Sequence, residues 1–202
     1  MLYDDTMVLI PAYNEEDNIG SVISKVNEYT GNVVVVDDAS TDETREIAEE
    51  RGATVIPHAI NIGVGGAVRT GFRHGIEGGY EYIVLLDADG QHYPEYIPEL
   101  LDVARKTDCD LVIGSRFLNE SYEEYSAVRR AGIKFFTRLV SFLGGIEISD
   151  ITSGYRVYKV DSLRELSRNQ DEHWAIEQTL EASRKDFKIE EVSVEMPTRE
   201  SG

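Results

Sequence analysis

Two carboxylates one residue apart, Asp87 and Asp89, follow the apolar run Tyr82–Leu86. That run has the length and character of a buried strand, and the period-two alternation of a strand lets both carboxylates point the same way. An open α/β sheet binds its ligands at the carboxyl ends of its strands. Two oxygen donors this close repel each other unless a cation lies between them, and Mg²⁺ or Mn²⁺ prefers such ligands. We expect a metal site here, with Gln91 adding a neutral oxygen; an Asp-rich turn is the simpler alternative.

Strand-like and helical stretches alternate through the first part of the chain, which predicts a mostly parallel sheet with right-handed crossovers. The predicted strands are Met7–Ile10, Val33–Val36, Thr54–Ile56, Tyr82–Leu86 and Leu111–Ile113, and the predicted helices are Asp17–Tyr29, Thr41–Arg51, Val64–Ile76 and Pro94–Lys106. After about residue 115 the pattern loosens. There we expect helices at Ala131–Leu143 and Trp174–Arg184, and strands at Tyr155–Val160 and Ile189–Glu195. No linker divides the chain, so we predict one domain.

Each early strand ends in polar or glycine-rich sequence. The five endings begin at Pro11, Asp37, Asn61, Asp87 and Gly114. Because parallel strands bring their carboxyl ends to one edge of the sheet, we expect these five segments to line a single site.

The residue types at that edge suit a nucleotide sugar. Tyr13 can stack on a base, Glu15 can hold a ribose, and Asp37 and Asp38 can accept hydrogen bonds from the N–H edge of the base. A metal at Asp87 and Asp89 would neutralise a diphosphate. Each of these residues, taken alone, would more often be a helix cap or a surface carboxylate.

Other phosphate-binding motifs are missing. The glycines from Gly63 to Gly66 break the G-x-G-x-x-G pattern at its last glycine and follow the third strand, whereas the dinucleotide fingerprint belongs to the first strand–helix turn. The P-loop pattern does not occur.

Composition limits the classes of partner and compartment. The chain of 202 residues carries a net charge of −18, which argues against a nucleic-acid partner. It has one cysteine, no run of about 18 or more apolar residues, and no basic-then-apolar start typical of a signal peptide. We therefore expect a cytoplasmic protein that can lie at the cytoplasmic face of a membrane. Only 6 of the 20 basic residues are Lys, which favours a halophilic protein over an ordinary acidic one.

Five motifs occur in a single order: P-A-Y-N-E-E-x-N-I, V-V-D-D-A-S-T-D-E-T, N-x-G-x-G-G-A, L-D-A-D-G-Q-H and S-G-Y-R. Together they resemble glycosyltransferase family 2, most of all its polyprenyl-phosphate (dolichol-phosphate) mannose or glucose synthases. The resemblance implies an α/β GT-A fold, with a Rossmann-like, mostly parallel sheet flanked by helices and a smaller C-terminal acceptor-side portion. It implies a nucleotide-sugar and metal-binding half (1–115), an acceptor-side half (116–202), Mg²⁺ or Mn²⁺, a GDP- or UDP-sugar donor, and inversion at the anomeric carbon.

The resemblance also assigns residues by position. The nucleoside would be held by Pro11, Ala12, Tyr13, Glu15 and Asp38, with Asp37 beside them, and the metal by Asp87, Asp89 and Gln91. Donor or acceptor phosphates would meet Arg116, Arg129 (or its neighbour Arg130) and Arg199. The reacting sugar would lie near Asp150 and the loop from Ser153 to Arg156. The catalytic residues implied in this way are Asp89, Asp150, Arg116 and Arg129. The residues implied to contact the acceptor are Arg130, Lys134, Ser153 and Arg156. Relatives often have a basic residue where this chain has Val64 or Gly66, so we assign the glycine loop no phosphate contact.

The segment Val128–Gly145 is basic and aromatic-rich within an acidic chain. Its charges are Arg129, Arg130, Lys134 and Arg138, and its apolar residues recur at helical spacing. Such a helix can lie on a membrane and collect a lipid phosphate. Alternatively, it packs its apolar face on the sheet.

The acceptor decides whether the reaction needs a base. A polyprenyl phosphate is already ionised, whereas a hydroxyl of a growing glycan requires a general base. Asp150 is then the first candidate and Glu177 the second, although Glu177 also suits a solvated helix face. A sugar nucleotidyltransferase is disfavoured because no glycine-rich loop with Arg or Lys follows the first strand. A non-catalytic nucleotide-sugar sensor would not need the metal ligands. The oligomeric state stays open.

Overall fold

The computed structural model describes residues 3–118, 147–166 and 174–196. Within these ranges one sheet has seven strands in the order β3-β2-β1-β4-β6-β5-β7. The strands are β1 (Thr6–Ala12), β2 (Val33–Asp37), β3 (Thr54–Pro57), β4 (Tyr82–Leu85), β5 (Leu111–Ser115), β6 (Arg156–Lys159) and β7 (Ile189–Ser193). The helices are α1 (Ile19–Val26), α2 (Thr44–Glu50), α3 (Val64–Gly78), the 3₁₀ turn η1 (Pro94–Tyr96), α4 (Ile97–Thr107), α6 (Val160–Leu163) and α7 (Trp174–Arg184).

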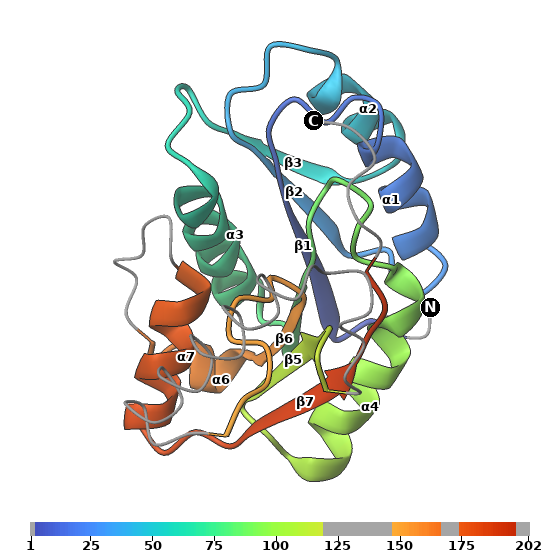
Figure 1. Ribbon diagram of the computed structural model, residues 1–202. Coiled ribbons are helices and arrows are strands. Elements are labelled where there is room, and N and C mark those ends of the chain that lie inside the picture. The colour runs from blue at the N-terminus through green and yellow to red at the C-terminus, as the bar shows by residue number, and fades with distance from the viewer. Residues whose placement is uncertain (1–2, 119–146, 167–173, 197–202) are drawn as a thin grey trace, which may run out of the picture.

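The sheet has a hydrophobic core on each face because its strands are apolar on both sides. In β1, Val8 and Ile10 belong to the core formed with α1, α2 and α4, whereas Met7 and Leu9 belong to the core formed with α3, α6 and α7. Figure 1 shows these two helical layers on either side of the sheet. Buried strands of this kind read as continuous apolar runs, which is why the early strands could be predicted.

Helix α3 lies unusually close to the sheet. A Cβ atom on Gly71 would lie 2.1 Å from a methyl carbon of Leu9, and one on Gly75 would lie 2.5 Å from a methyl carbon of Ile83. The glycines therefore set the distance between this helix and the central strands.

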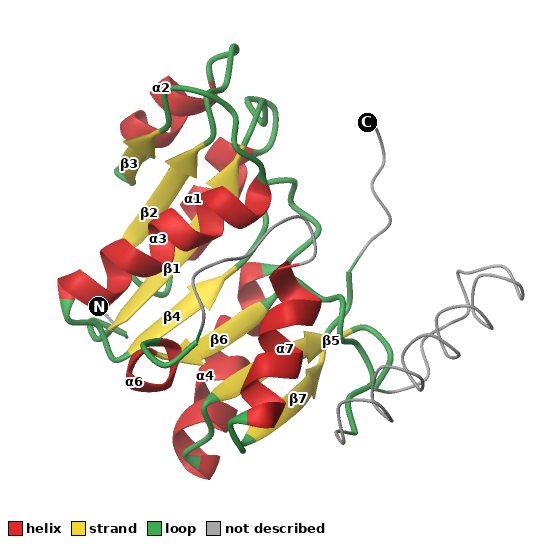
Figure 2. Ribbon diagram, turned by 90° about the vertical axis from the view of Figure 1, so that its left-hand side faces the viewer, coloured by secondary structure: helices red, strands yellow, loops and turns green. Residues whose placement is uncertain are grey.

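The predicted mostly parallel sheet is confirmed, with one exception that shapes the site. Strands β1, β2, β3 and β4 run parallel, and Figure 2 shows their arrowheads at one edge. Strand β6 is antiparallel to both β4 and β5. The amino end of β6 therefore lies at the edge where the carboxyl ends of β4 and β5 lie, and the segment before Arg156 reaches the same edge.

Three helices begin later than predicted, among them α4, which starts at Ile97 after the 3₁₀ turn η1 and not at Pro94. Helix α1 starts at Ile19, not at Asp17, because the carbonyl of Glu15 accepts the amides of Asn18 and Ile19 in a turn before the helix. Helix α2 starts at Thr44 because residues 40–43 form a loop instead. The predicted helix at 131–143 lies outside the described residues.

Candidate active site

The loops after β1 and β2 hold each other in place. The backbone N–H of Asn14 donates to Ser40 Oγ at 3.0 Å, and Asn14 Oδ1 accepts the backbone N–H of Thr41 at 2.8 Å. The backbone N–H of Glu15 donates to Thr44 Oγ1 at 2.7 Å. These bonds join the two motifs that were predicted to bind the nucleoside, so each loop stabilises the conformation of the other.

Asp42 and Glu16 extend this network to the start of α2. Asp42 Oδ2 accepts the backbone N–H of Glu16, and Asp42 Oδ1 accepts both the backbone N–H and the hydroxyl of Thr44. The Glu16 carboxylate in turn accepts the backbone N–H of Glu43. Burial by itself would raise the pKa of Asp42, but the hydrogen bonds from Thr44 and Glu16 outweigh it and hold the pKa below its ordinary value. The Asp42 carboxylate is therefore a structural part of the nucleoside-side loops.

The adjacent carboxylates Asp37 and Asp38 are both buried at the end of β2. Asp38 accepts the backbone N–H groups of Ile62 (3.0 Å) and Gly63 (2.8 Å), and its Oδ1 lies 2.7 Å from His58 Nδ1. Asp37 Oδ1 accepts the backbone N–H of Ser40. Asp38 therefore positions the glycine loop after β3, a role that the sequence did not reveal.

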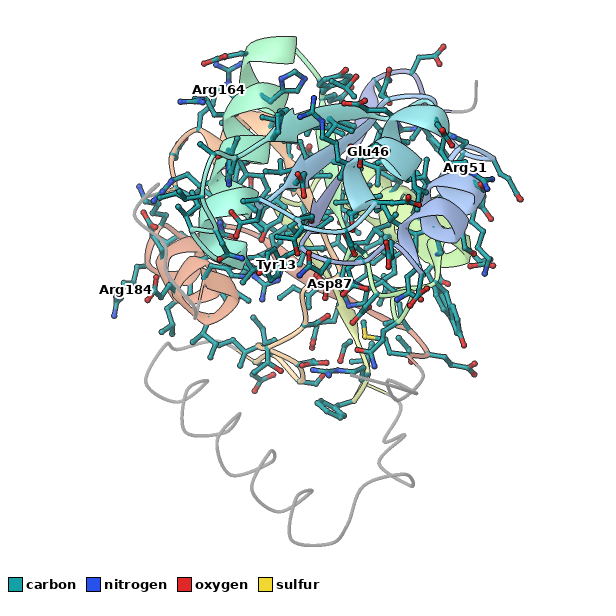
Figure 3. The ribbon with its side chains drawn as sticks, turned by 90° about the horizontal axis from the view of Figure 1, so that it is seen from above. Tyr13, Glu46, Arg51, Asp87, Arg164 and Arg184 are labelled. Atoms are coloured by element: carbon teal, nitrogen blue, oxygen red, sulfur yellow. The ribbon has the colours of Figure 1, made fainter. Side chains whose placement is uncertain are left out.

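The remaining nucleoside-side residues lie along the end of β1. Pro11 and Ala12 are buried in the strand, in register with Val36 and Asp37 of β2. Tyr13 follows them and is 48% exposed. Figure 3, which looks down on the carboxyl edge, labels Tyr13 close to Asp87 in that view. The tyrosine ring is thus available for stacking beside the loop that follows β4.

The predicted metal ligands form a tight turn after β4. Gly90 has a φ of 76°, and the backbone N–H of Gln91 donates to Asp89 Oδ1 at 3.0 Å. The backbone N–H of Asp87 donates to Nδ1 of the buried His92 at 2.9 Å. The His92 ring, through the hydrogen bond that its Nδ1 accepts, therefore holds the backbone of the turn in place. His92 directly follows the D-A-D-G-Q motif, but its motif position alone did not reveal this role.

The chemistry of this turn suits a divalent cation. The Asp87 side chain is 41% exposed, and its Oδ2 lies 3.6 Å from Nδ1 of His92. No cluster of three or more His, Cys, Asp or Glu side chains with metal-binding geometry occurs in the described ranges. The turn therefore supplies two carboxylates and an amide oxygen, and leaves the other coordination positions to a ligand or water.

The loop before β6 lies against the same turn. A Cβ on Gly154 would lie 3.4 Å from Asp87 Oδ2, so the backbone of this loop passes next to the carboxylate. The Tyr155 ring stacks on His92 at 5.1 Å, and its hydroxyl donates to the carbonyl of Tyr93 at 2.9 Å. Burial raises the pKa of Tyr155 well above its ordinary value, which keeps this hydroxyl a donor. Two segments distant in sequence thus form one structural unit.

Arg116, at the end of β5, is held by Asp150. Its Nε and Nη2 donate to the two Asp150 oxygens at 2.7 and 2.9 Å, and Nη2 also donates to Thr152 Oγ1. Asp150 is 1% exposed, whereas the Arg116 side chain is 29% exposed. This corrects the expectation of Asp150 as a base, because both of its oxygens are occupied and it is shielded from solvent. Asp150 positions Arg116.

Sequence reasoning missed the residue that anchors this pair. The Glu191 carboxylate of β7 accepts the backbone N–H groups of Ser149 and Asp150 and the hydroxyl of Ser149. Ser149 Oγ also lies 2.6 Å from Ser115 Oγ. The available signal was a pair of glutamates inside an otherwise strand-like run, but that pattern is equally typical of a solvated edge strand.

Arg156 has a different position from the one expected for an acceptor contact. It is fully buried, and it donates to the carbonyls of Ser153 and Ile151 and to Thr179 Oγ1. Its guanidinium lies over the Trp174 ring at 5.4 Å. Ser153 is also buried, with Oγ accepting the N–H of Tyr155. These findings correct the expectation of acceptor contacts from either side chain: both shape the loop that lies against Asp87.

Four predicted residues lie outside the described ranges. They are Arg129, Arg130, Lys134 and Arg199.

Comparison with known proteins defines the class to which this fold and site belong. The family model for glycosyl transferase family 2 matches residues 7–167. The chain belongs to this family, and its mostly parallel sheet flanked by helices is the GT-A fold.

Two relatives and one solved structure make the comparison more specific. Undecaprenyl-phosphate mannosyltransferase of Micrococcus luteus is 34% identical, over 97% of this chain and 85% of its own. A dolichyl-phosphate hexose transferase of Haloferax volcanii is 32% identical, over 98% of this chain and 84% of its own. Glucosyl-3-phosphoglycerate synthase of Mycobacterium tuberculosis, crystallised with Mn²⁺, UDP and glucosyl-3-phosphoglycerate, has a TM-score of 0.75 at 19% identity, covering 99% of this chain and 73% of that one. This last likeness supports the fold.

None of the described helices is long and apolar enough to cross a membrane.

Proposed function

We propose that this protein transfers a hexose from a GDP- or UDP-sugar to a polyprenyl phosphate, with inversion at the anomeric carbon. The named activities of its relatives, a mannosyltransferase acting on undecaprenyl phosphate and a hexose transferase acting on dolichyl phosphate, support the acceptor class. The observation that carries the proposal is the position of the Asp87–Asp89 turn. It lies at one sheet edge, with the nucleoside-side loops on β1 and β2 and with the loop before β6 against Asp87.

On the donor side, Tyr13 would stack on the base, Asp37 would accept its N–H edge, and Glu15 would hold the ribose. Pro11 and Ala12 would form the floor of this site as buried strand backbone, and Asp38 would keep the glycine loop in place. Asp87, Asp89 and Gln91 would hold Mg²⁺ or Mn²⁺. When bound, such a cation would neutralise negative charge on the departing diphosphate.

On the phosphate side, the exposed part of Arg116 would face the donor diphosphate. Its bidentate pair with Asp150 fixes the orientation of the guanidinium before substrate binds, so little reorganisation is needed as charge develops in the transition state. We propose the same class of contact for Arg129 and Arg199, and an acceptor-phosphate role for Arg130 and Lys134.

The position of Asp150 also favours a phosphate acceptor over a glycan hydroxyl. An ionised phosphate oxygen can form its bond to the anomeric carbon while the bond to the diphosphate oxygen breaks, and no proton has to be removed. Asp150 is occupied by Arg116, and Glu177 is exposed on α7. Neither candidate base is therefore placed as a glycan acceptor would require.

The test is a panel of GDP- and UDP-sugars against a short-chain polyprenyl phosphate and against a soluble oligosaccharide. We expect sugar transfer to the prenyl phosphate with one donor class, and an anomeric configuration opposite to that of the donor by NMR. Transfer to the oligosaccharide alone would contradict the proposed acceptor. Transfer with retained configuration would contradict the single-displacement mechanism.

A further inference from the structure

The loop between β3 and α3 displays three branched apolar side chains to solvent. Ile60 is 69% exposed, Ile62 46% and Val64 41%. We call these three residues the apolar lip. They follow the carboxyl end of β3, so the apolar lip lies at the same edge of the sheet as the candidate active site (Figure 1).

The exposure of the lip is built into the fold. The buried carboxylate of Asp38 accepts the backbone N–H groups of Ile62 and Gly63. His58, bonded to Asp38 through Nδ1, lies 2.9 Å from Thr70 Oγ1 of α3 through Nε2 and ties the loop to that helix. The Ile62 side chain packs in part against Gly66 of α3, whereas Ile60 and Val64 flank it with their side chains exposed. The pinned backbone thus holds a contiguous apolar surface at a fixed position, and such surfaces mark interaction sites.

The charge around the lip differs from that of the rest of the chain. The protein has a net charge of −18, yet no Asp or Glu occurs between Glu50 and Glu77. This stretch contains the lip and the exposed arginines Arg69 and Arg73 of α3. Within the described residues Arg73 makes no ion pair. A stretch of chain without acidic residues that presents apolar and cationic groups is complementary to an anionic, partly apolar surface.

We propose that the apolar lip, with Arg69 and Arg73, is the surface by which this protein contacts a lipid bilayer that carries anionic head groups. The inference rests on the proposed function, because a polyprenyl phosphate acceptor resides in a bilayer. The lip would insert its branched side chains between head groups, the arginines would meet lipid phosphates, and the acidic remainder of the surface would be repelled. This contact would bring the active-site edge to the membrane.

The test is co-sedimentation of the full chain with phosphatidylcholine vesicles, with and without phosphatidylglycerol. We expect binding that increases with phosphatidylglycerol. Ile60→Ser combined with Val64→Ser should weaken it by about tenfold, since each removes apolar area from the membrane contact. The matched control is Leu118→Ser, an exposed apolar residue outside the lip. For charge, Arg73→Ser should weaken binding to phosphatidylglycerol vesicles, whereas Arg51→Ser, on the far side of the molecule from α3 in Figure 3, should not.

Two further measurements separate this inference from the proposed function. Transfer to a short-chain, water-soluble prenyl phosphate should be the same for the wild type and the lip variants, whereas transfer to a long-chain acceptor in vesicles should fall with vesicle binding. If the wild type transfers sugar to the soluble acceptor but does not bind vesicles, the apolar lip is not a membrane contact, and the proposed function still holds. If calorimetry shows that the lip variants lose donor affinity as strongly as they lose vesicle binding, the membrane role is also contradicted, because the lip would then contact the donor. Absence of transfer to either acceptor would instead contradict the proposed function.

Discussion

The two halves of the site use their motif residues differently. On the donor side, the loops after β1 and β2 bond to each other, and Tyr13 and the Asp87 side chain after β4 are exposed at the edge of the sheet, whereas Asp37 and Asp38 are buried. On the acceptor side, Asp150 and the motif residue Arg156 are both buried and bond to the protein itself.

The difference shows that a motif identifies a position but not a role. Both halves place their motifs at the same edge of the sheet, so both look alike in the sequence. Burial separates the groups that can meet a substrate from the groups that hold them. We therefore expect changes at the exposed donor-side residues to affect turnover more than stability, and changes at the buried residues of either side to affect stability as well.

The largest expected effect is on the turn after β4. Asp89→Asn should lower turnover by roughly a thousandfold, because the turn loses a charged ligand where negative charge develops. The melting temperature should stay near that of the wild type, since Asp89 is only partly buried. Asp102→Asn, an exposed carboxylate on α4, is the matched control and should leave turnover unchanged. Full sugar transfer by Asp89→Asn, or by wild-type protein in EDTA, would show that the metal assignment is wrong.

A substitution of Arg156 tests whether the buried acceptor-side residues stabilise the fold. Arg156→Leu should lower the free energy of unfolding by about 2–4 kcal/mol, because the carbonyls of Ile151 and Ser153 lose their donors inside the protein. Urea unfolding measures this, with the exposed Arg164→Leu as control. If stability is unchanged while the KM for the acceptor rises, Arg156 contacts the acceptor as the family resemblance implied.

A smaller effect is expected for the dependence of the melting temperature on salt, which involves the whole acidic surface. If the charge of −18 is an adaptation to salt, the melting temperature should rise as KCl increases from tenths molar to molar, because screening reduces repulsion among the carboxylates. A melting temperature that stays flat or falls over this range would leave the acidity unexplained.

The smallest effect concerns the network at α2. The pKa of Asp42 is lower in the folded state than in the unfolded chain, so its ionised form stabilises the fold above the unfolded value of 3.8, and this contribution is lost as the pH falls through the folded pKa. Asp42→Asn should therefore be less stable than the wild type at pH 7, by about 1–2 kcal/mol, with the gap closing below about pH 4. A gap that persists in acid would mean that shape, not charge, is responsible.

The sequence predicted the fold well because buried strands and amphipathic helices have strong local patterns. In α1, which lies within the predicted helix Asp17–Tyr29, the apolar residues Ile19, Val22, Ile23 and Val26 recur at helical spacing and are buried. The sequence could not predict that Asp38 would hold the loop after β3, or that Glu191 would anchor Asp150. Those partners lie 24 or more residues away, and only the folded sheet brings them together.

The same limit explains the error on Arg156. Its position in the motif S-G-Y-R placed it near the acceptor, but β6 runs antiparallel through the middle of the sheet, and its first side chain points into the core. The direction of a strand is not encoded in its own residues.

The most direct test of the donor-side site is a crystal structure with Mn²⁺ and the preferred nucleotide sugar. Anomalous scattering from Mn²⁺ should give a peak within coordination distance of carboxylate oxygens of Asp87 and Asp89, with the diphosphate on its other side and the base over Tyr13. A bound nucleotide whose diphosphate lies away from the turn after β4, or a turn without a manganese peak in crystals where the nucleotide is bound, would contradict the account.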